Sequence, residues 1–252
     1  MDTDDYWAIA EQDIEIQNPL TDRKLRLLDD YCDIRDGLDV LDIGCGKAWV
    51  MRHWAERFAI TGTGIETNRH FLEFAGNRLP ARGRIAYAPG PARDFAAPPD
   101  HYDIVMCVGA AFALGGLVEA IDRMVAAAKP GGTVVLGERT LRHKPVSAQG
   151  EILPHDALDT IAIIERHGAE VSATISASEA DYERYASHHR HSTLTWARLH
   201  PNHPDHAEAK EWLDDYDPDE IDELPIKYAL SRIANRRNAA RARLAMKATG
   251  KT

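Results

Sequence analysis

The sequence predicts an α/β fold built on a doubly wound, Rossmann-like parallel sheet. Apolar segments of strand length, among them residues 38–43, 60–65 and 103–108, alternate with segments of helical periodicity. The apolar segments are almost continuous, as in strands that are covered on both faces of a parallel sheet. Each runs into a glycine or an acid, and doubly wound sheets bind their ligands at that edge. These observations together predict a ligand site at the carboxyl ends of the strands.

An N-terminal helical cap is predicted over residues 1–37, ahead of the first strand. Its helices are expected over residues 6–12 and 21–31, and Thr21 has the side chain of an N-cap residue. The second helix carries an apolar stripe at helical spacing, formed by Leu25, Leu28 and Cys32.

The core of the fold is predicted over residues 38–177, where strands and helices alternate. Such alternation implies right-handed crossovers and helices on both faces of the sheet. In chain order, the expected elements are strand 38–43, helix 49–58, strand 60–65, a third strand before Gly90, strand 103–110, helix 117–128, strand 133–136, helix 157–167 and strand 170–175.

Residues 178–224 break the alternation and are predicted to form a helical lid insertion. A helix over residues 179–200 is followed by two prolines and then by an acidic helix over residues 205–216. Residues 225–235 supply the last core strand, which is the seventh and antiparallel. Because the insertion lies between the last two strands, we expect it to cover the carboxyl edge of the sheet.

The turn after the first strand is the most informative part of the sequence. Residues 44–46 have two glycines around a cysteine, and the second strand ends on Glu66. Glycines let the backbone approach a ligand, and a carboxylate at that position can accept both hydroxyls of a ribose. Trp49 replaces the third glycine of a dinucleotide site, and Ala48 replaces the hydroxyl residue of a phosphate-binding loop. The pattern predicts a site for an adenosine-containing molecule, with a plain tight turn as the alternative.

Length and composition fit one globular unit with an elaboration. The chain has 252 residues, of which 44% are hydrophobic, enough to bury a core of this size. No apolar run reaches the roughly 20 residues that cross a bilayer, and the acidic N-terminus lacks the order of a signal peptide. Three scattered cysteines do not suggest a disulfide framework. We therefore expect a cytoplasmic protein.

The net charge of −10 is unevenly distributed. A basic tail over residues 236–252 has six basic residues and no acid, so residues 1–235 carry −16. An acidic body repels a polyanion, which argues against nucleic acid as the substrate. The tail leaves contact with RNA or with an acidic partner open, and a solvated or frayed terminus is the alternative.

The run from Val40 to Lys47, with Asp42 two residues before the first glycine, resembles motif I of the class I S-adenosylmethionine (SAM) methyltransferases. The turn of residues 129–132 is similar to the one before strand five of that superfamily. Over about residues 6–233, the chain resembles a little-characterised bacterial branch of small-molecule type. The segments that carry this closer resemblance are Asn18-Pro19-Leu20, Leu41-Asp42-Ile43-Gly44-Cys45-Gly46-Lys47, Ile60-Thr61-Gly62-Thr63-Gly64-Ile65-Glu66, Cys107-Val108-Gly109-Ala110, Leu136-Gly137-Glu138 and Tyr182-Glu183-Arg184-Tyr185.

The resemblance implies a seven-stranded sheet, SAM as the cofactor, S-adenosylhomocysteine (SAH) as its product, and a small-molecule methyl acceptor. Methyl transfer from a sulfonium is an in-line displacement, and most of its catalysis can come from positioning in a site closed to water. The implied cofactor-binding residues are Asp42, Gly44, Cys45, Gly46, Glu66, Thr67, Ala92, Val108 and Gly109.

Two departures from the family pattern bear on the site. Pro91 stands where the family has an aspartate that reaches the adenine amino group, which leaves the backbone N–H of Ala92 as a substitute. Losing one such hydrogen bond weakens binding by roughly 1 kcal/mol. Glu138, at the end of strand five, is followed by Arg139 rather than by proline and aromatic residues, so a different acceptor is expected.

Glu138 and Tyr185 are the candidate catalytic residues if the acceptor must lose a proton. Further candidates on the lid helix are Tyr182, His188 and His189, and exposed positions on that helix are the alternative for each. We expect Tyr182, Tyr185 and Trp196 to wall an acceptor pocket that residues 1–30 help to enclose.

Two questions stay open at this point. A methyltransferase-like protein that binds SAM or SAH without turnover is an alternative to an enzyme, because Pro91 and the surroundings of Glu138 differ from the family. The histidines between residues 188 and 206 lack a zinc-site pattern, and no metal is predicted. Oligomeric state is not predicted.

Overall fold

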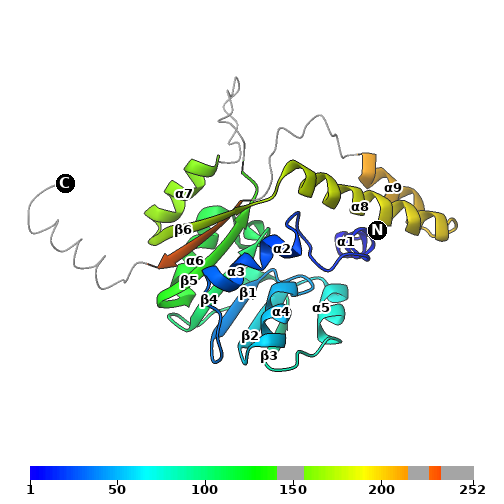
Figure 1. Cartoon of the computed structure of the whole chain (residues 1–252). Coiled ribbons are helices and arrows are strands. Elements are labelled where there is room, and N and C mark those ends of the chain that lie inside the picture. Colours follow the sequence, from blue (N-terminus) through cyan, green and yellow to red (C-terminus); the bar gives the residue numbers. More distant parts are fainter. Residues whose placement is uncertain (141–155, 215–226, 234–252) are drawn as a thin grey trace, which may run out of the picture.

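The computed structural model describes residues 1–140, 156–214 and 227–233, and it is an α/β fold around one twisted sheet (Figure 1). The strand order is β3-β2-β1-β4-β5-β7-β6; the first five strands are parallel, and β7 is antiparallel to both β5 and β6. The strands are β1 (Asp39–Ile43), β2 (Thr61–Glu66), β3 (Arg84–Pro89), β4 (Tyr102–Val108), β5 (Ala128–Glu138), β6 (Ala169–Ser176) and β7 (Lys227–Ile233). The predicted α/β fold with a parallel sheet is confirmed.

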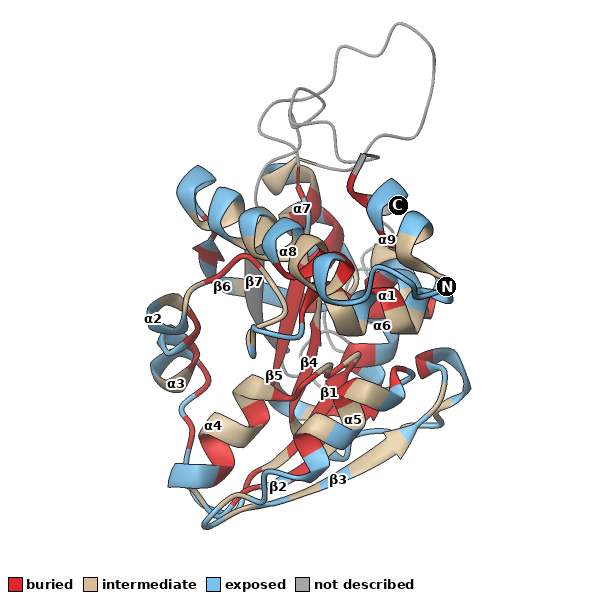
Figure 2. Ribbon diagram, turned by 90° about the vertical axis from the view of Figure 1, so that its right-hand side faces the viewer, coloured by how far each residue is buried: buried red, intermediate tan, exposed pale blue. Residues whose placement is uncertain are grey.

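Helices cover both faces of the sheet, as the alternation in the sequence predicts (Figure 1). Neighbouring β1 residues point to opposite sides: Leu41 packs in the hydrophobic cluster under α6 and α7, and Val40 packs in the cluster under α3 and α4. Buried residues concentrate in the central strands (Figure 2). The helices are α1 (Thr3–Ala10), α2 (Asp22–Leu25), α3 (Leu27–Tyr31), α4 (Trp49–Arg57), α5 (Arg69–Gly76), α6 (Leu117–Ala127), α7 (Ala157–Arg166), α8 (Glu179–Leu199) and α9 (His206–Asp214), with short 3₁₀ turns η1 (Ala92–Asp94) and η2 (Ala111–Leu114).

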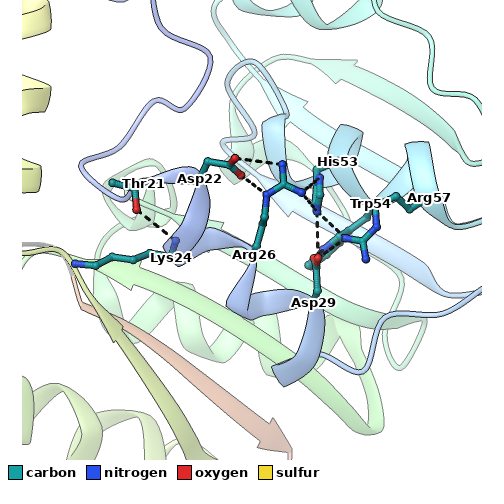
Figure 3. Close-up of polar contacts among 8 residues, drawn as sticks. All are labelled: Thr21, Asp22, Lys24, Arg26, Asp29, His53, Trp54 and Arg57. Atoms are coloured by element: carbon teal, nitrogen blue, oxygen red, sulfur yellow. Dashed lines mark hydrogen bonds and ion pairs between the residues drawn. The ribbon is translucent and has the colours of Figure 1, made fainter.

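The N-terminal segment is fastened to α4 by a polar network (Figure 3). Asp29 of α3 accepts hydrogen bonds from Trp54 Nε1 at 2.8 Å and from Arg57, and it contacts His53 Nε2 at 3.1 Å. Trp54 itself is fully buried. One carboxylate therefore satisfies the indole N–H of the largest fully buried side chain, and it holds the segment against α4.

The N-terminal helices differ in detail from the prediction. The first helix begins at Thr3 rather than at residue 6, because the Asp2 side chain caps it by accepting the Asp5 N–H at 2.8 Å. Thr21 caps the next helix as expected. That helix is interrupted at Arg26, whose ψ of −16° tightens the turn toward 3₁₀ geometry.

Strand five is longer than predicted because the glycine turn lies inside it. Tyr102 pairs with Ala128 and Ile104 with Thr133, so the residues between 128 and 133 bulge out of the ladder. Lys129, on the bulge, bonds Asp103 Oδ2 at 2.8 Å and fixes it to β4.

Helices α8 and α9 occupy the described part of the predicted lid. Residues 215–224 of the lid, the start of the last strand and the basic tail 236–252 lie outside the described residues. Among the helices that are described, none is both long enough and apolar enough to cross a bilayer.

Candidate functional site

A cavity of about 540 Å³ lies at the carboxyl ends of β1, β2 and β4. The structure brings all nine predicted cofactor-binding residues into its lining, although they come from four separate turns. Tyr185 of α8 reaches the same cavity. The predicted residues that line it are Asp42, Gly44, Cys45, Gly46, Glu66, Thr67, Ala92, Val108, Gly109 and Tyr185.

The turn after β1 can take its shape only with glycine at position 44. Gly44 has a φ of +70°, and a Cβ on it would lie 2.4 Å from the Cβ of Ala110. The N–H groups of Gly44 and Cys45 both donate to the carbonyl of Ile65, at 2.9 and 3.0 Å. The turn is thereby packed against the segment after β4 and bonded to the end of β2. These contacts fix the floor of the cavity.

Glu66 is oriented by the backbone around it. Its Oε2 accepts the N–H of Gly46 at 2.8 Å, and its Oε1 accepts those of Thr67 at 2.8 Å and Asn68 at 2.9 Å. The Thr67 hydroxyl is a further donor, 3.3 Å from Oε1, so the acceptor site left for a ligand hydroxyl is on Oε2, which has the Gly46 N–H as its one donor among the described residues. Glu66 also lines the cavity, as a ribose-binding acid must.

Asp42 is a buried acid, with only 6% of its surface exposed. Burial raises its pKa to about 7, and the negative charge of Glu66 adds to the shift. Within the described part of the chain, no residue donates a hydrogen bond to its side chain. Burial likewise raises the pKa of the Cys45 thiol, so this cysteine is a small buried side chain in its protonated form.

Lys47 joins the glycine turn to the N-terminal segment, a role that the sequence analysis missed. Its Nζ donates to the carbonyls of Glu11 and Ile14, each at 2.6 Å, and its backbone N–H donates to Gln17. The side chain is 4% exposed, and burial lowers its pKa. Its position two residues from Cys45 could have suggested a site residue, but the sequence contains no signal for the direction in which the Lys47 side chain points.

A second wall of the cavity forms where the N-terminal segment meets α8. The buried carboxylate of Glu11 accepts a hydrogen bond from the Tyr185 hydroxyl at 2.5 Å, contacts His189 Nε2 at 3.1 Å and also accepts from Gln17. Trp7 lies edge-on to His189, with ring centroids 5.4 Å apart. Glu11 and Tyr185 are 174 positions apart. No local pattern could have paired them.

Several predicted candidates lie elsewhere. Glu138 is absent from the described lining; it accepts the Ala111 N–H at 3.2 Å, and burial raises its pKa. Among the described residues, Tyr182 and Trp196 do not line the cavity either, and Trp196 stacks on His200 at 5.0 Å instead. No three His, Cys, Asp or Glu side chains in the described ranges are placed to hold a metal ion.

Lys47→Met is expected to lower the free energy of unfolding by about 2 kcal/mol, because two buried carbonyls lose a charged donor. Urea denaturation of parent and variant measures the change. Lys24→Met is the matched control. The Lys24 ammonium also bonds a carbonyl and a carboxylate, but it is about a third exposed, so its loss should cost less than about 1 kcal/mol. Equal losses of unfolding free energy in the two variants would show that burial does not strengthen the hydrogen bonds of the Lys47 ammonium.

Comparison with known proteins finds relatives that share this sequence and fold. Residues 40–132 match the model of the methyltransferase domain family. Protein YjhP of Escherichia coli strain K12, described as uncharacterized, is 26% identical over 223 residues, covering 83% of this chain and 89% of YjhP.

Two solved structures share the fold over nearly their whole length. A SAM-dependent methyltransferase from Thiobacillus denitrificans, in complex with SAH, superposes with a TM-score of 0.80 at 23% identity, covering 92% of this chain and 100% of that one. One from Geobacter sulfurreducens, also with SAH, gives 0.77 at 22% identity, with 91% and 98% coverage. Residues 40–132 thus match a methyltransferase domain, and the chain shares the fold of these SAM-dependent methyltransferases, as its motifs predicted.

Proposed function

We propose that this protein is a SAM-dependent methyltransferase that transfers a methyl group to a small-molecule acceptor. The observation that carries the proposal is the convergence of Glu66, the 44–46 turn and Gly109 on one cavity. The neighbours from Thiobacillus and Geobacter, which hold SAH, support the same cofactor here. The match to YjhP over 223 residues supports the little-characterised bacterial branch as its place in the superfamily.

The residues present fit SAM on three counts. Glu66 has an acceptor site on Oε2 for one ribose hydroxyl, and a second ribose hydroxyl would replace the Thr67 hydroxyl on Oε1. Gly90 and Gly109 line the cavity with φ of +132° and +72°, conformations that glycine adopts at low cost. Asp42 places a buried carboxylate near a ligand that carries positive charge. When bound, SAM supplies a methyl group on a sulfonium, which an acceptor attacks in line.

We further propose that residues 1–37 and the insertion 178–224 act as a cap and lid around the core 38–177, with residues 225–235 completing the sheet and 236–252 as a tail. The contact of Tyr185 with Glu11 supports this, because it joins α8 to the N-terminal segment in one wall of the cavity. Such a cover would exclude water from the transfer. Tyr185 is then the acceptor-side candidate, and Glu138 supports the backbone after β4 through Ala111.

Binding and turnover of the full-length protein test the proposal. Calorimetric titration with SAM and SAH tests the cofactor site, and methyl-labelled SAM with a panel of small thiols, amines and carboxylates tests turnover. Binding without turnover on any acceptor would favour the non-catalytic alternative. Labelling of RNA with a steep salt dependence, lost on deletion of residues 236–252, would favour an RNA methyltransferase.

Pro91→Asp is expected to tighten SAH binding a few-fold, or roughly 1 kcal/mol, by restoring an adenine contact. The backbone at Pro91 (φ −62°, ψ 131°) is open to any residue, and position 91 caps η1, where Asp is favoured. Calorimetry with SAH measures the change. Pro91→Ala is the control, since it removes the proline without adding a carboxylate. Equal affinities of the two variants would refute the missing-contact argument.

A further inference from the structure

The cavity is lined by far more negative than positive charge. Its described charged side chains are the acids Asp4, Glu11, Glu15, Asp42 and Glu66 and the base Lys47. A site for a phosphorylated or carboxylic acceptor would need the opposite balance, because an anion pays for approaching buried carboxylates.

The positive side chain near the cavity is already engaged. The Lys47 ammonium donates to the carbonyls of Glu11 and Ile14, so it is held in the wall rather than presented to a ligand. On the rim, Arg52 pairs with Glu15 at 2.7 Å, which offsets that one acid. Asp42 and Glu66 belong to the proposed cofactor site. Glu11 is therefore the buried acid of the second wall, and Gln17 links it to the glycine turn by donating to Glu11 and accepting the Lys47 N–H.

Glu11 has the features of a cation-binding carboxylate. It is 4% exposed and lines the cavity, and its three neutral or histidine donors leave about one of four acceptor sites for a ligand N–H. Two aromatic side chains of the lining adjoin it. Tyr185 bonds it directly, and Trp7, 37% exposed, packs on the histidine that contacts it. A carboxylate flanked by aromatic rings favours an organic cation.

We propose that the methyl acceptor is a small organic amine, held through its positively charged nitrogen by Glu11, with Trp7 and Tyr185 flanking it. The inference rests on the proposed function, since it names the acceptor class of that site. It concerns the group by which the acceptor is held. That nitrogen receives the methyl group only after it has given its proton to the Glu11 carboxylate; otherwise a second nucleophile on the same molecule receives it.

Matched probes of opposite charge test the proposal on the full-length protein saturated with SAH. Phenethylamine is compared with phenylpropanoate, and butylamine with pentanoate, by calorimetry at pH 7.5. We expect the amines to bind and the acids of the same shape not to bind. Glu11→Gln should weaken amine binding by about tenfold or more, since a charge-assisted hydrogen bond is lost, and should leave SAH affinity unchanged within about twofold.

Two further variants separate this role from folding. Asp13→Asn is the matched control, because Asp13 bonds Ser192 of α8 at 3.0 Å from the same segment but is not part of the described lining. It should bind amines as the parent does. Trp7→Leu keeps Glu11 and removes one aromatic face, so it should weaken amine binding a few-fold.

The outcomes distinguish this inference from the proposed function. A parent protein that binds no SAH overturns the proposed function and the inference with it. A parent that binds SAH but binds acids as tightly as amines, or binds no amine, overturns the inference alone. Loss of SAH affinity in Glu11→Gln would also overturn it, because Glu11 would then belong to the cofactor site.

Discussion

Replacing Glu66 with alanine is expected to weaken SAM and SAH binding by roughly 2–4 kcal/mol, or about 30- to 1,000-fold. The proposed role of Glu66 is to accept both ribose hydroxyls, and hydrogen bonds to a charged group contribute about 1.5–3 kcal/mol each without being additive. The structure adds a second reason. The carboxylate also accepts the N–H groups of Gly46, Thr67 and Asn68, so its loss frees the turn that forms the cavity floor.

Glu66→Gln should cost less than the alanine variant, because one acceptor oxygen survives. It should still cost more than one ligand hydrogen bond. Both carboxylate oxygens face backbone donors, so the amide NH₂ must oppose the N–H of Gly46 or those of Thr67 and Asn68. The expected order of SAH affinity is parent, then Gln, then Ala.

Calorimetric titration of the three proteins with SAH measures this order. Glu73→Ala is the control, since Glu73 is an exposed acid on the next helix, α5, and does not line the cavity. If Glu66→Ala binds as the parent and Glu73→Ala do, the nucleoside is held elsewhere and the motif interpretation fails.

The sequence predicted those parts of the site that depend on local patterns. The glycine turn and the acid after β2 are each set by a strand end, and parallel strands bring their carboxyl ends to one edge. Together with the family resemblance, this geometry assigned nine residues to the cofactor site, and all nine line one cavity. The sequence did not predict contacts that depend on how the cap folds back. Glu11 meets Tyr185 across 174 positions, and this pairing follows from the packing of α1 and α8.

The errors within elements have similar causes. The bulge in β5 depends on the partner strand, because Lys129 is fixed by Asp103 of β4. Trp196 has the amphipathic side chain of a pocket wall, but on α8 it lies against His200 and away from the cavity. Composition suggests what a side chain can do, whereas the helix's rotation decides which surface it faces.

Asp42→Asn is expected to stabilise the protein increasingly as the pH rises. The folded-state pKa of Asp42 is raised to about 7 from its ordinary value of 3.8, chiefly by burial and then by the charge of Glu66. A raised acid pKa favours folding fully below the unfolded value, and this contribution is lost as the pH rises through the folded value. Between the two pKa values the loss is about 1.4 kcal/mol per pH unit, and above the folded value it stops. The variant should therefore gain about 3 kcal/mol over the parent between pH 5 and pH 8.5, nearly all of it below pH 7.

Urea denaturation of both proteins at the two pH values measures this gain, and the difference between them cancels the titration of other groups. An advantage of Asp42→Asn that does not change with pH would mean that the acid is ionised at low cost. In the Glu66→Ala background the gain should shrink without vanishing, because burial outweighs the charge of Glu66 among the causes of the shift. Asp42→Asn should also weaken SAM binding. The buried negative charge of Asp42, which destabilises the fold, is the charge that a cationic cofactor offsets.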